Sequence, residues 1–314
     1  MNIETKMILD KIFEESNLNN TKNIYIFSHR MHDVDAKCSA LALVQFFKYK
    51  GFNSKYIITK EDFLLTDTFG KVEVTEEISK EKFVAVCVDT ATKAILENNF
   101  CFNARKIFKI DHHKDGENYA DYSLIMEHVS STCEILSMLI PEKYIKDNIA
   151  TLLYAGIRSD TGGFSYSTSA NTFSEVVKLI LKGANHLYIN RVLNTVALKR
   201  KKIEALVNTH AKFFSKDLLG AIIYDSKDFK ALSLARAVNG LTNVKAKVFF
   251  VIAKSNTEDT FFEIRSATTC DIDVSIISKK YGGGGHFHAS GFSKKNVTNK
   301  FIYEFIDELK EMLL

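Results

Sequence analysis

The sequence predicts an α/β protein with two domains: a mainly parallel, doubly wound sheet, followed by a smaller α/β domain. Three observations predict this class. Short β-branched or aromatic runs alternate with segments of helical periodicity in the first half of the chain. These runs are apolar at successive positions, which is typical of parallel strands buried on both faces. The length of 314 residues also exceeds that of a typical single domain.

The first domain begins with an expected strand at 23–28, "NIYIFS", followed by a helix at 35–51. Gly51 can end this helix, because glycine readily takes the left-handed conformation that a C-cap requires. Further strands and helices follow, and their alternation favours a parallel sheet. Strands are expected at 54–59, 82–88 and 105–110, and helices at 131–140, 143–157 and 172–182.

A second domain is expected after residues 190–214, which have the periodicity of one long uncapped helix and so predict a connector. The residues beyond it predict an α/β domain with a partly antiparallel sheet. Its apolar runs lie at 218–225, 247–253 and 261–267, and its helical patterns at 228–241 and 297–313. We therefore divide the chain into a first domain at 1–189, the connector helix at 190–214 and a second domain at 215–314.

Composition narrows the class of protein. A net charge of +4 and a pI near 8.6 suit an anionic substrate but are too weak to imply long duplex nucleic acid, and a lysine-rich surface gives the same values. The five cysteines are scattered and never form a C-x-x-C pair, which indicates reduced thiols of a cytosolic protein. No stretch approaches the roughly 18–20 apolar residues of a membrane span. We expect a cytoplasmic protein.

Acidic and histidine residues cluster where the expected strands end. In an open parallel sheet, ligands bind beyond the carboxyl ends of the strands. One aspartate after a strand more often caps a helix or forms a turn, but here four segments end in such residues. They are His29, Asp33 and Asp35 after the first strand, Asp89 after 82–88, Asp111, His112 and His113 after 105–110, and Asp160 after a helical stretch.

Four carboxylates in one crevice would repel one another and lose hydration, so such a site needs cations. The four are Asp33, Asp35, Asp89 and Asp160. Two divalent ions would neutralise this charge, with His29 and His112 completing their coordination. Oxygen ligation with some imidazole favours Mn²⁺, with Mg²⁺, Co²⁺ or Fe²⁺ as alternatives, over a structural zinc site. Two such ions, about 3.5–4 Å apart, can clamp the attacking and leaving oxygens of a phosphoryl displacement.

The segment "IDHHKDG" (110–116) resembles the signature of the DHH phosphoesterase superfamily. The resemblance extends to the H-x-x-x-D-x-D segment at 29–35, to "VDT" at 88–90 and to "SDTGGF" at 159–164, in the expected order. It covers nearly the whole chain. Each part is a weak signal alone, and together they are specific.

This resemblance implies a role for each clustered side chain. The implied metal ligands are His29 and Asp33 for one ion, Asp35, His112 and Asp160 for the other, and Asp89 as a bridge between them. His113 would contact the scissile phosphate or assist proton transfer. Asp111 would orient its neighbours.

The run "YGGGGHFHASGF" (281–292) allows two interpretations. Four glycines alone are more typical of a flexible surface turn. The histidine directly after them favours an anion site, where backbone N–H groups converge and the imidazole adds a donor. The run resembles the GGGH loop of the DHHA1 domain, which follows DHH domains. The implied substrate-binding residues are Gly283, Gly284, Gly285 and His286.

The segment "EIRSA" (263–267) resembles the strand whose arginine holds the substrate's phosphate in this family, which implies that Arg265 is a bidentate clamp. The implied active site lies in the cleft between a catalytic DHH domain and a substrate-binding DHHA1 domain.

The combination resembles the compact oligoribonuclease and pAp-phosphatase branch, the nanoRNase type. It implies an Mn²⁺-dependent phosphodiesterase and exonuclease that degrades very short RNA to mononucleotides, and a 3',5'-bisphosphate nucleotidase that converts pAp (3'-phosphoadenosine 5'-phosphate) to AMP. Two alternatives stay open: a linear or cyclic dinucleotide phosphodiesterase (pGpG, pApA or c-di-AMP type), and a non-catalytic nucleotide- or RNA-binding module. The expected partners are short single-stranded RNA and pAp, with a homodimer as an option. Neither long duplex nucleic acid nor a membrane is expected.

The first motif departs from the family pattern at three positions. The family usually has Pro where His32 stands, a small residue near Val34 and Gly at Cys38, whereas the metal-binding positions are kept. We expect activity to survive, with metal preference open to change. His32 is expected to be a partly exposed neighbour of the ligands, with an extra metal ligand as the alternative.

Overall fold

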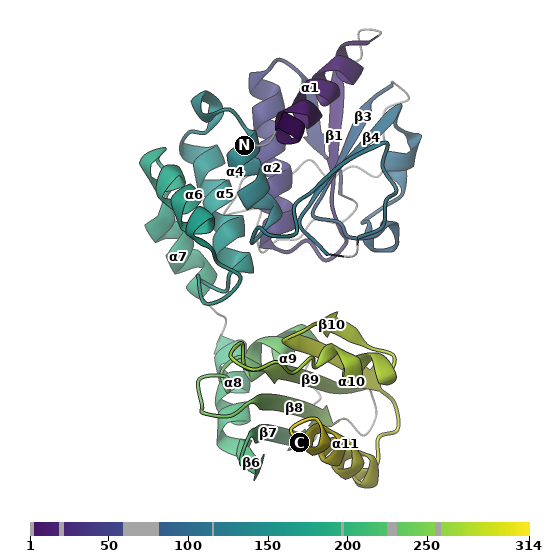
Figure 1. Ribbon diagram of the computed structural model, residues 1–314, viewed down its shortest axis with the longest axis vertical. Coiled ribbons are helices and arrows are strands. Elements are labelled where there is room, and N and C mark those ends of the chain that lie inside the picture. The colour runs from purple at the N-terminus through teal and green to yellow at the C-terminus, as the bar shows by residue number, and fades with distance from the viewer. Residues whose placement is uncertain are drawn as a thin grey trace. The chain divides into compact units, whose positions relative to one another are not determined.

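The computed structural model describes residues 3–18, 22–58, 82–114, 116–195, 198–224, 231–254 and 259–314. The chain forms two compact units, Met1–Asn194 and Thr195–Leu314 (Figure 1). Each unit contains its own sheet with helices packed against it. The predicted α/β class is therefore confirmed. None of the described helices is long and apolar enough to cross a membrane.

The described part of the first unit contains a five-stranded sheet in the order β2-β1-β3-β4-β5, with every neighbouring pair parallel. The strands are β1 (Asn23–Phe27), β2 (Asn53–Tyr56), β3 (Val84–Val88), β4 (Lys106–Asp111) and β5 (Tyr122–Ile125). Every residue of β1 and β3 is buried, as the apolar runs predicted. Strand β5 was not predicted; it is half-buried, and its first two residues are a tyrosine and a serine.

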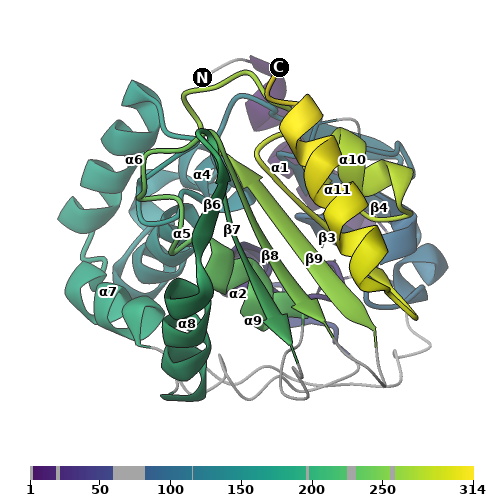
Figure 2. The ribbon, with the colours of Figure 1, turned by 90° about the horizontal axis from the view of Figure 1, so that it is seen from below.

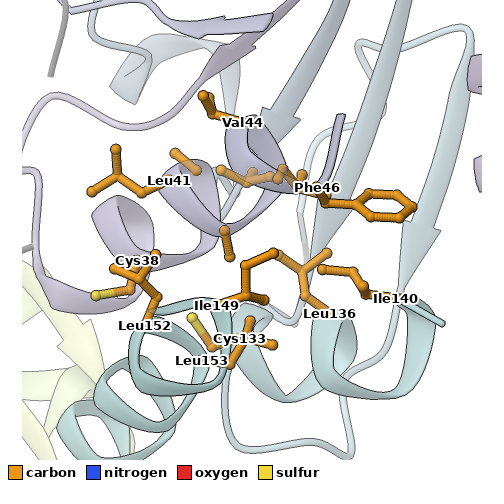
Figure 3. Packing of buried hydrophobic residues seen from close by; sticks show 14 of the residues in the cluster. Cys38, Leu41, Val44, Phe46, Cys133, Leu136, Ile140, Ile149, Leu152 and Leu153 are labelled. Atoms are coloured by element: carbon orange, nitrogen blue, oxygen red, sulfur yellow. The ribbon is translucent and has the colours of Figure 1, made fainter. Parts of the chain in front are cut away.

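Helices cover one face of this sheet. They are α1 (Ile3–Asn17), α2 (Val34–Tyr49), α4 (Thr132–Leu139) and α5 (Asp147–Asp160), while α6 (Ala170–Leu181) and α7 (His186–Asn194) pack against α5. Alternate strand residues such as Ile26, Val86 and Phe108 join their core. Figure 3 shows α2 facing α4 and α5, with Cys38 near Leu152 and Cys133.

The opposite face of the sheet carries a smaller apolar cluster. Tyr25, Ala85 and Ile107 point into it. Within the described residues, short 3₁₀ segments pack here instead of long helices; Cys101 lies in one of them, and Leu96 directly follows the other. These segments are η2 (Lys93–Ile95) and η3 (Phe100–Asn103), while η4 (Glu142–Tyr144) precedes α5.

In the second unit, the described strands form a six-stranded sheet in the order β10-β11-β9-β8-β7-β6. Only β7 and β8 pair in parallel, so the sheet is partly antiparallel, as predicted. The strands are β6 (Lys212–Ser215), β7 (Leu218–Tyr224), β8 (Val248–Lys254), β9 (Thr260–Ser266), β10 (Gly284–His286) and β11 (Ala289–Lys294). On one face lie α8 (Leu198–His210) and α9 (Ala231–Val238), and on the other α10 (Ser275–Lys280) and α11 (Asn299–Glu311) (Figure 2).

The predicted single connector helix at 190–214 is wrong. Helix α7 ends at Asn194, α8 begins at Leu198 and Lys212–Ser215 is strand β6. The two helices share one apolar periodicity but pack into different cores, since Ile189 belongs to the first unit's core and Val207 to the second's. The boundary between the two units lies between Asn194 and Thr195 in the chain, inside the range predicted for the connector.

Candidate active site

Three parallel strands of the first unit place their carboxyl ends side by side. Phe27 of β1 pairs with Cys87 of β3, and Val88 of β3 pairs with Ile110 of β4. The polar residues that follow or end these strands therefore emerge at one edge of the sheet. They are His29 and its neighbours after β1, Asp89 after β3 and the Asp111–His113 motif at the end of β4.

Among the described residues, three groups of side chains could each hold a metal ion, with the ligand atoms of each group within 4.8 Å of one another. The groups are His29, Asp33 and Asp89; Asp35, His112 and Asp160; and Asp89, His112 and His113. Two groups share Asp89 and two share His112, so they form one continuous cluster. All seven side chains come from the set that the sequence singled out, and their role as ligands stays a prediction.

Asp89 lies at the centre of this cluster. Its carboxylate is 3.4 Å from His29 Nε2, 3.5 Å from His112 Nε2 and 3.6 Å from His113 Nδ1. The hydroxyl of Thr132 donates a hydrogen bond to it at 3.2 Å. The backbone of Asp89 takes φ +53°, a left-handed conformation that non-glycine residues rarely adopt. Such a residue persists where its surroundings hold it, and this is common at functional sites.

The loop after β1 directs His29 at two carboxylates. The backbone N–H of Met31 donates to His29 Nδ1 at 3.1 Å, which turns Nε2 toward Asp33 and Asp89. Asp33 is the N-cap of α2 and accepts the N–H of Ala36 through Oδ1 at 3.0 Å, while its Oδ2 is 3.4 Å from His29 Nε2. The helix cap therefore uses one oxygen of this carboxylate, and the other oxygen faces His29, so capping does not compete with the predicted metal binding.

Asp35 is fully buried against the N-terminus of α4. Its two oxygens accept the backbone N–H groups of Thr132 at 2.7 Å and Cys133 at 3.0 Å. Donors at a helix N-terminus stabilise a negative charge. Helix α5 also approaches closely, because a Cβ atom at Gly156 would lie 2.5 Å from Asp35 Oδ1. Asp160, at the end of the same helix, is 3.6 Å from His112 Nε2.

Asp111 orients the two histidines that follow it. Its Oδ1 accepts the backbone N–H groups of His112 at 2.9 Å and His113 at 3.3 Å, and it lies 2.8 Å from His113 Nδ1. Burial alone would raise the pKa of Asp111, but the hydrogen bond from His113 and then the charges of His113 and Lys109 lower it below its ordinary value. An ionised Asp111 fixes the His113 ring with a proton on Nδ1.

The electrostatics of the cluster fit a bound cation. Burial and the charge of Asp89 raise the pKa of Asp35 to about 7, and burial and the neighbouring carboxylates raise that of Asp160. Burial alone would lower the histidine pKa values, but the carboxylates beside them raise that of His29 to about 10 and that of His112 to about 9. The raised pKa values mean that these side chains hold protons, which balance the negative charge of the carboxylates. Oxygen donors with some imidazole are a ligand set for divalent ions.

In the second unit, Arg265 of β9 contacts the end of α9. Its Nη2 donates to the carbonyl of Ala235 at 2.9 Å and its Nε to Asn239 Oδ1 at 2.9 Å, while Nη1 is 3.4 Å from Glu263 Oε2. A cation at a helix C-terminus is stabilising. The predicted phosphate clamp stays a prediction.

Part of the glycine run is an edge strand, so the predicted loop is wrong for Gly284–His286. Gly284–His286 form β10, which pairs with β11. A Cβ atom at Gly283 would lie 2.2 Å from the carbonyl of Gly291, and one at Gly285 would lie 2.4 Å from that of Ala289. Glycine is therefore required at both positions by the close approach of the strands. Gly284 has open space above it and His286 is exposed.

Two family models match the chain. The model of the N-terminal domain of the DHH family matches residues 23–157, and the DHHA1 domain model matches residues 215–313. This chain belongs to the DHH family. It is therefore a hydrolase of the phosphoesterase type, and its clustered acids and histidines lie in the DHH domain.

The DHH chain is similar to proteins of known sequence along most of its length. It is 26% identical over 303 residues to a probable bifunctional oligoribonuclease and PAP phosphatase NrnA of Streptococcus mutans, covering 92% of this chain and 94% of that protein. It is 24% identical to the cyclic-di-AMP phosphodiesterase GdpP of Bacillus subtilis, covering 93% of this chain and 48% of that protein. An exopolyphosphatase-related protein from Bacteroides fragilis shares the fold, with a TM-score of 0.83 at 20% identity over 98% of this chain and 96% of that one.

His32, a departure from the DHH pattern, is not partly exposed as predicted. It is buried, and both ring nitrogens have partners: Nε2 is 2.7 Å from Glu97 Oε2, and Nδ1 is 3.1 Å from the hydroxyl of Tyr56. That hydroxyl is 2.5 Å from Ser28 Oγ, and the N–H of Glu97 donates to the carbonyl of Ser28. We call these four residues the His32 network. It borders the loop that carries His29.

Three residues that position the DHH site were missed from the sequence as functional. For the segment 130–132 the sequence favours helix capping, with a phosphate contact as the alternative; Ser131 caps α4, whereas Thr132 donates to Asp89. Gly156 lies within a helical pattern, where a glycine costs stability and so signals a packing constraint. Lys109 is a charged residue within an apolar strand, which was the available signal for it.

Proposed function

We propose that this DHH-family protein is a two-metal phosphoesterase that hydrolyses very short RNA oligonucleotides to mononucleotides and dephosphorylates pAp to AMP. The observation that carries the proposal is the position of Asp89, which contacts His29 on one side and His112 on the other. A carboxylate shared by two adjacent groups of ligands is what a pair of neighbouring cations requires. The similarity to a probable oligoribonuclease and PAP phosphatase, over nearly the full length of both chains, supports the choice of substrate.

The proposed ligands follow the groups in the cluster. His29 and Asp33 would hold one cation, Asp35, His112 and Asp160 the other, and Asp89 both. Mn²⁺ suits this mixture of carboxylate and imidazole donors. Bound cations would supply charge neutralisation of the phosphate and a lowered pKa of water.

The remaining residues would act on the substrate directly. His113 is held by Asp111 through Nδ1, so Nε2 is the ring nitrogen that would exchange a proton with a phosphate oxygen or the leaving group. In the second unit, we propose that Arg265 and the backbone of Gly283, Gly284 and Gly285, with His286, bind the terminal phosphate of the substrate. Binding one end of the substrate would restrict turnover to short chains.

The test is a time course with Mn²⁺ on 5'-labelled RNA of 2–5 nucleotides, a 20-nucleotide RNA and pAp. We expect the short RNAs and pAp to be consumed much faster than the 20-mer. Asp89→Asn should lower kcat by more than about 100-fold, beyond the effect typical of residues that only contact ligands. Asp10→Asn, a matched change at an exposed aspartate, should leave kcat unaltered. Equal rates on the 20-mer would contradict the substrate assignment. Tight binding without product, unaffected by Asp89→Asn, would favour a binding module.

A second candidate substrate class is the dinucleotides. The similarity to a cyclic-di-AMP phosphodiesterase covers 93% of this chain, which favours including c-di-AMP, pApA and pGpG in the same time course. Faster turnover of c-di-AMP than of dinucleotide RNA and pAp would replace the nanoRNase assignment with this one.

A further inference from the structure

Lys109 is a buried charge that lies between two apolar residues of β4, close to the site. Its side chain is 0% exposed, and the neighbouring residues of β4 are Phe108 and Ile110. Because strand side chains alternate, Lys109 lies on the same face of the sheet as Asp111, two residues further along. An ammonium group buried this fully persists only if partners replace its hydration.

The Lys109 ammonium has three such partners from three segments. It donates to the carbonyl of Ala91 at 2.9 Å and to that of Glu117 at 3.1 Å, and it lies 3.2 Å from Asp111 Oδ2. The contact with Asp111 is an ion pair without the alignment of a hydrogen bond, since Oδ2 has no hydrogen-bond partner. A Cβ atom at Gly116 would lie 3.0 Å from Nζ, so the chain passes directly over the ammonium.

These contacts link Lys109 to two parts of the proposed active site. Ala91 follows Asp89 by two residues, so Lys109 anchors the loop that holds the central carboxylate. The second link is to Asp111, whose Oδ1 accepts the N–H groups of His112 and His113 and lies 2.8 Å from His113 Nδ1. One oxygen of Asp111 therefore faces Lys109, and the other faces the two histidines.

We propose that Lys109 is a positioning residue of the catalytic site. Its ammonium fixes the rotation of the Asp111 carboxylate, which in turn fixes the His113 ring, and it ties the Asp89 loop to the end of β4. The proposal rests on the proposed function for its kinetic readout alone. Lys109 touches no reacting atom and acts through Asp111 and the Ala91 carbonyl.

The test is a double-mutant cycle on Lys109→Met and Asp111→Asn, with turnover measured on dinucleotide RNA and on bis(p-nitrophenyl) phosphate. Lys109→Met keeps the length of the side chain and removes its charge. We expect kcat to fall by about 10–100-fold with KM little changed, as for other outer partners of a catalytic site. In the Asp111→Asn background, the same change should lower kcat several-fold less than in the wild type, because only the contact of Lys109 with the Ala91 carbonyl is left to lose. An equal loss in both backgrounds, or no loss in either, would overturn the proposal.

Lys106→Met is the matched control, because Lys106 lies on the same strand and pairs with Asp121 at the surface. We expect it to leave kcat unaltered. If Lys109→Met fails to fold, Gly116→Ala tests the same contacts, since the added methyl group would lie 3.0 Å from the ammonium and 3.1 Å from the Ala91 carbonyl oxygen and should shift both. It should lower kcat more in the wild type than in Asp111→Asn, and an equal loss in both would contradict the proposal.

A readout that needs no substrate separates this inference from the proposed function. In ¹⁵N-histidine NMR spectra, assigned with His113→Gln, the wild type should show His113 with its proton on Nδ1. Lys109→Met should shift or abolish this signal, and Lys106→Met should preserve it. A signal unchanged by Lys109→Met would overturn the proposal, whether or not the wild type degrades RNA.

Discussion

His32 shows how one side chain can hold a loop in an unfavourable conformation. Its backbone takes φ +43°, which costs about 1–3 kcal/mol in a non-glycine residue. Burial lowers the pKa of its imidazole below the ordinary value, although Glu97 opposes this. A neutral ring can donate from Nε2 to Glu97 and accept at Nδ1 from the Tyr56 hydroxyl, which in turn accepts from Ser28. Both nitrogens of the His32 imidazole and the hydroxyls of Tyr56 and Ser28 then have hydrogen-bond partners.

The His32 network predicts that removing one hydroxyl group lowers the stability of the protein. Tyr56→Phe leaves Ser28 and His32 Nδ1 without their partner in a buried environment, so the free energy of unfolding should fall by about 1–3 kcal/mol. Urea unfolding followed by circular dichroism measures it. Tyr49→Phe removes the same group from a tyrosine that is 65% exposed and should change stability by less than about 0.5 kcal/mol. Similar losses in the two variants would show that the His32 network does not contribute to stability.

At the scale of elements, the site depends on how closely α5 approaches α2 and α4. Asp35 at the start of α2 accepts two N–H groups of α4, while Gly156 of α5 leaves no room for a side chain beside them. A Cβ atom there would lie 2.3 Å from Cys133 Sγ and 2.5 Å from Asp35 Oδ1. The distance between these helices therefore sets the position of a proposed metal ligand.

Gly156→Ala should destabilise the protein, although alanine is the better helix former by about 1 kcal/mol at an exposed position. Overpacking typically costs about 1–3 kcal/mol, and the displaced Asp35 should also weaken Mn²⁺ binding. Thermal unfolding and isothermal titration with MnCl₂ measure the two effects. The double variant Cys133→Ala/Gly156→Ala removes the sulfur from the clash, so its loss of stability should be smaller than the sum of the single losses. Additive losses would place the cause elsewhere.

At the scale of the molecule, the sequence predicted the parallel sheet and the position of the acid and histidine cluster, because both follow from strand order. Apolar runs identify β1, β3 and β4, and the residues after them must emerge at one edge. The sequence did not predict contacts that depend on which helices meet. Thr132 reaches Asp89 from the start of α4, and the absence of a side chain at Gly156 lets α5 approach α2 and α4 closely. The break between α7 and α8 was also missed, since one apolar period runs through two helices with separate cores.

The charge of the whole cluster predicts how stability and metal binding depend on pH. His29 and His112 have pKa values of about 10 and 9 in the folded chain against about 6.5 when unfolded. The folded state therefore binds more protons between these values. The stability that the two histidines contribute is fully present below about pH 6.5 and is lost as the pH rises toward 9–10. The loss is at most about 1.4 kcal/mol per pH unit for each group.

Divalent cations compete with these protons, so metal binding should strengthen as the pH rises. Scanning calorimetry from pH 6.5 to 8.5 should show the Tm in EDTA falling with pH, while the increase in Tm on adding MnCl₂ grows. His112→Gln should reduce both trends, because it removes one titrating group and one donor atom. Asp10→Asn should reproduce the wild-type curves. If the increase in Tm with Mn²⁺ were the same at pH 6.5 and 8.5, the cation would bind elsewhere, and the cluster around Asp89 would not be the metal site.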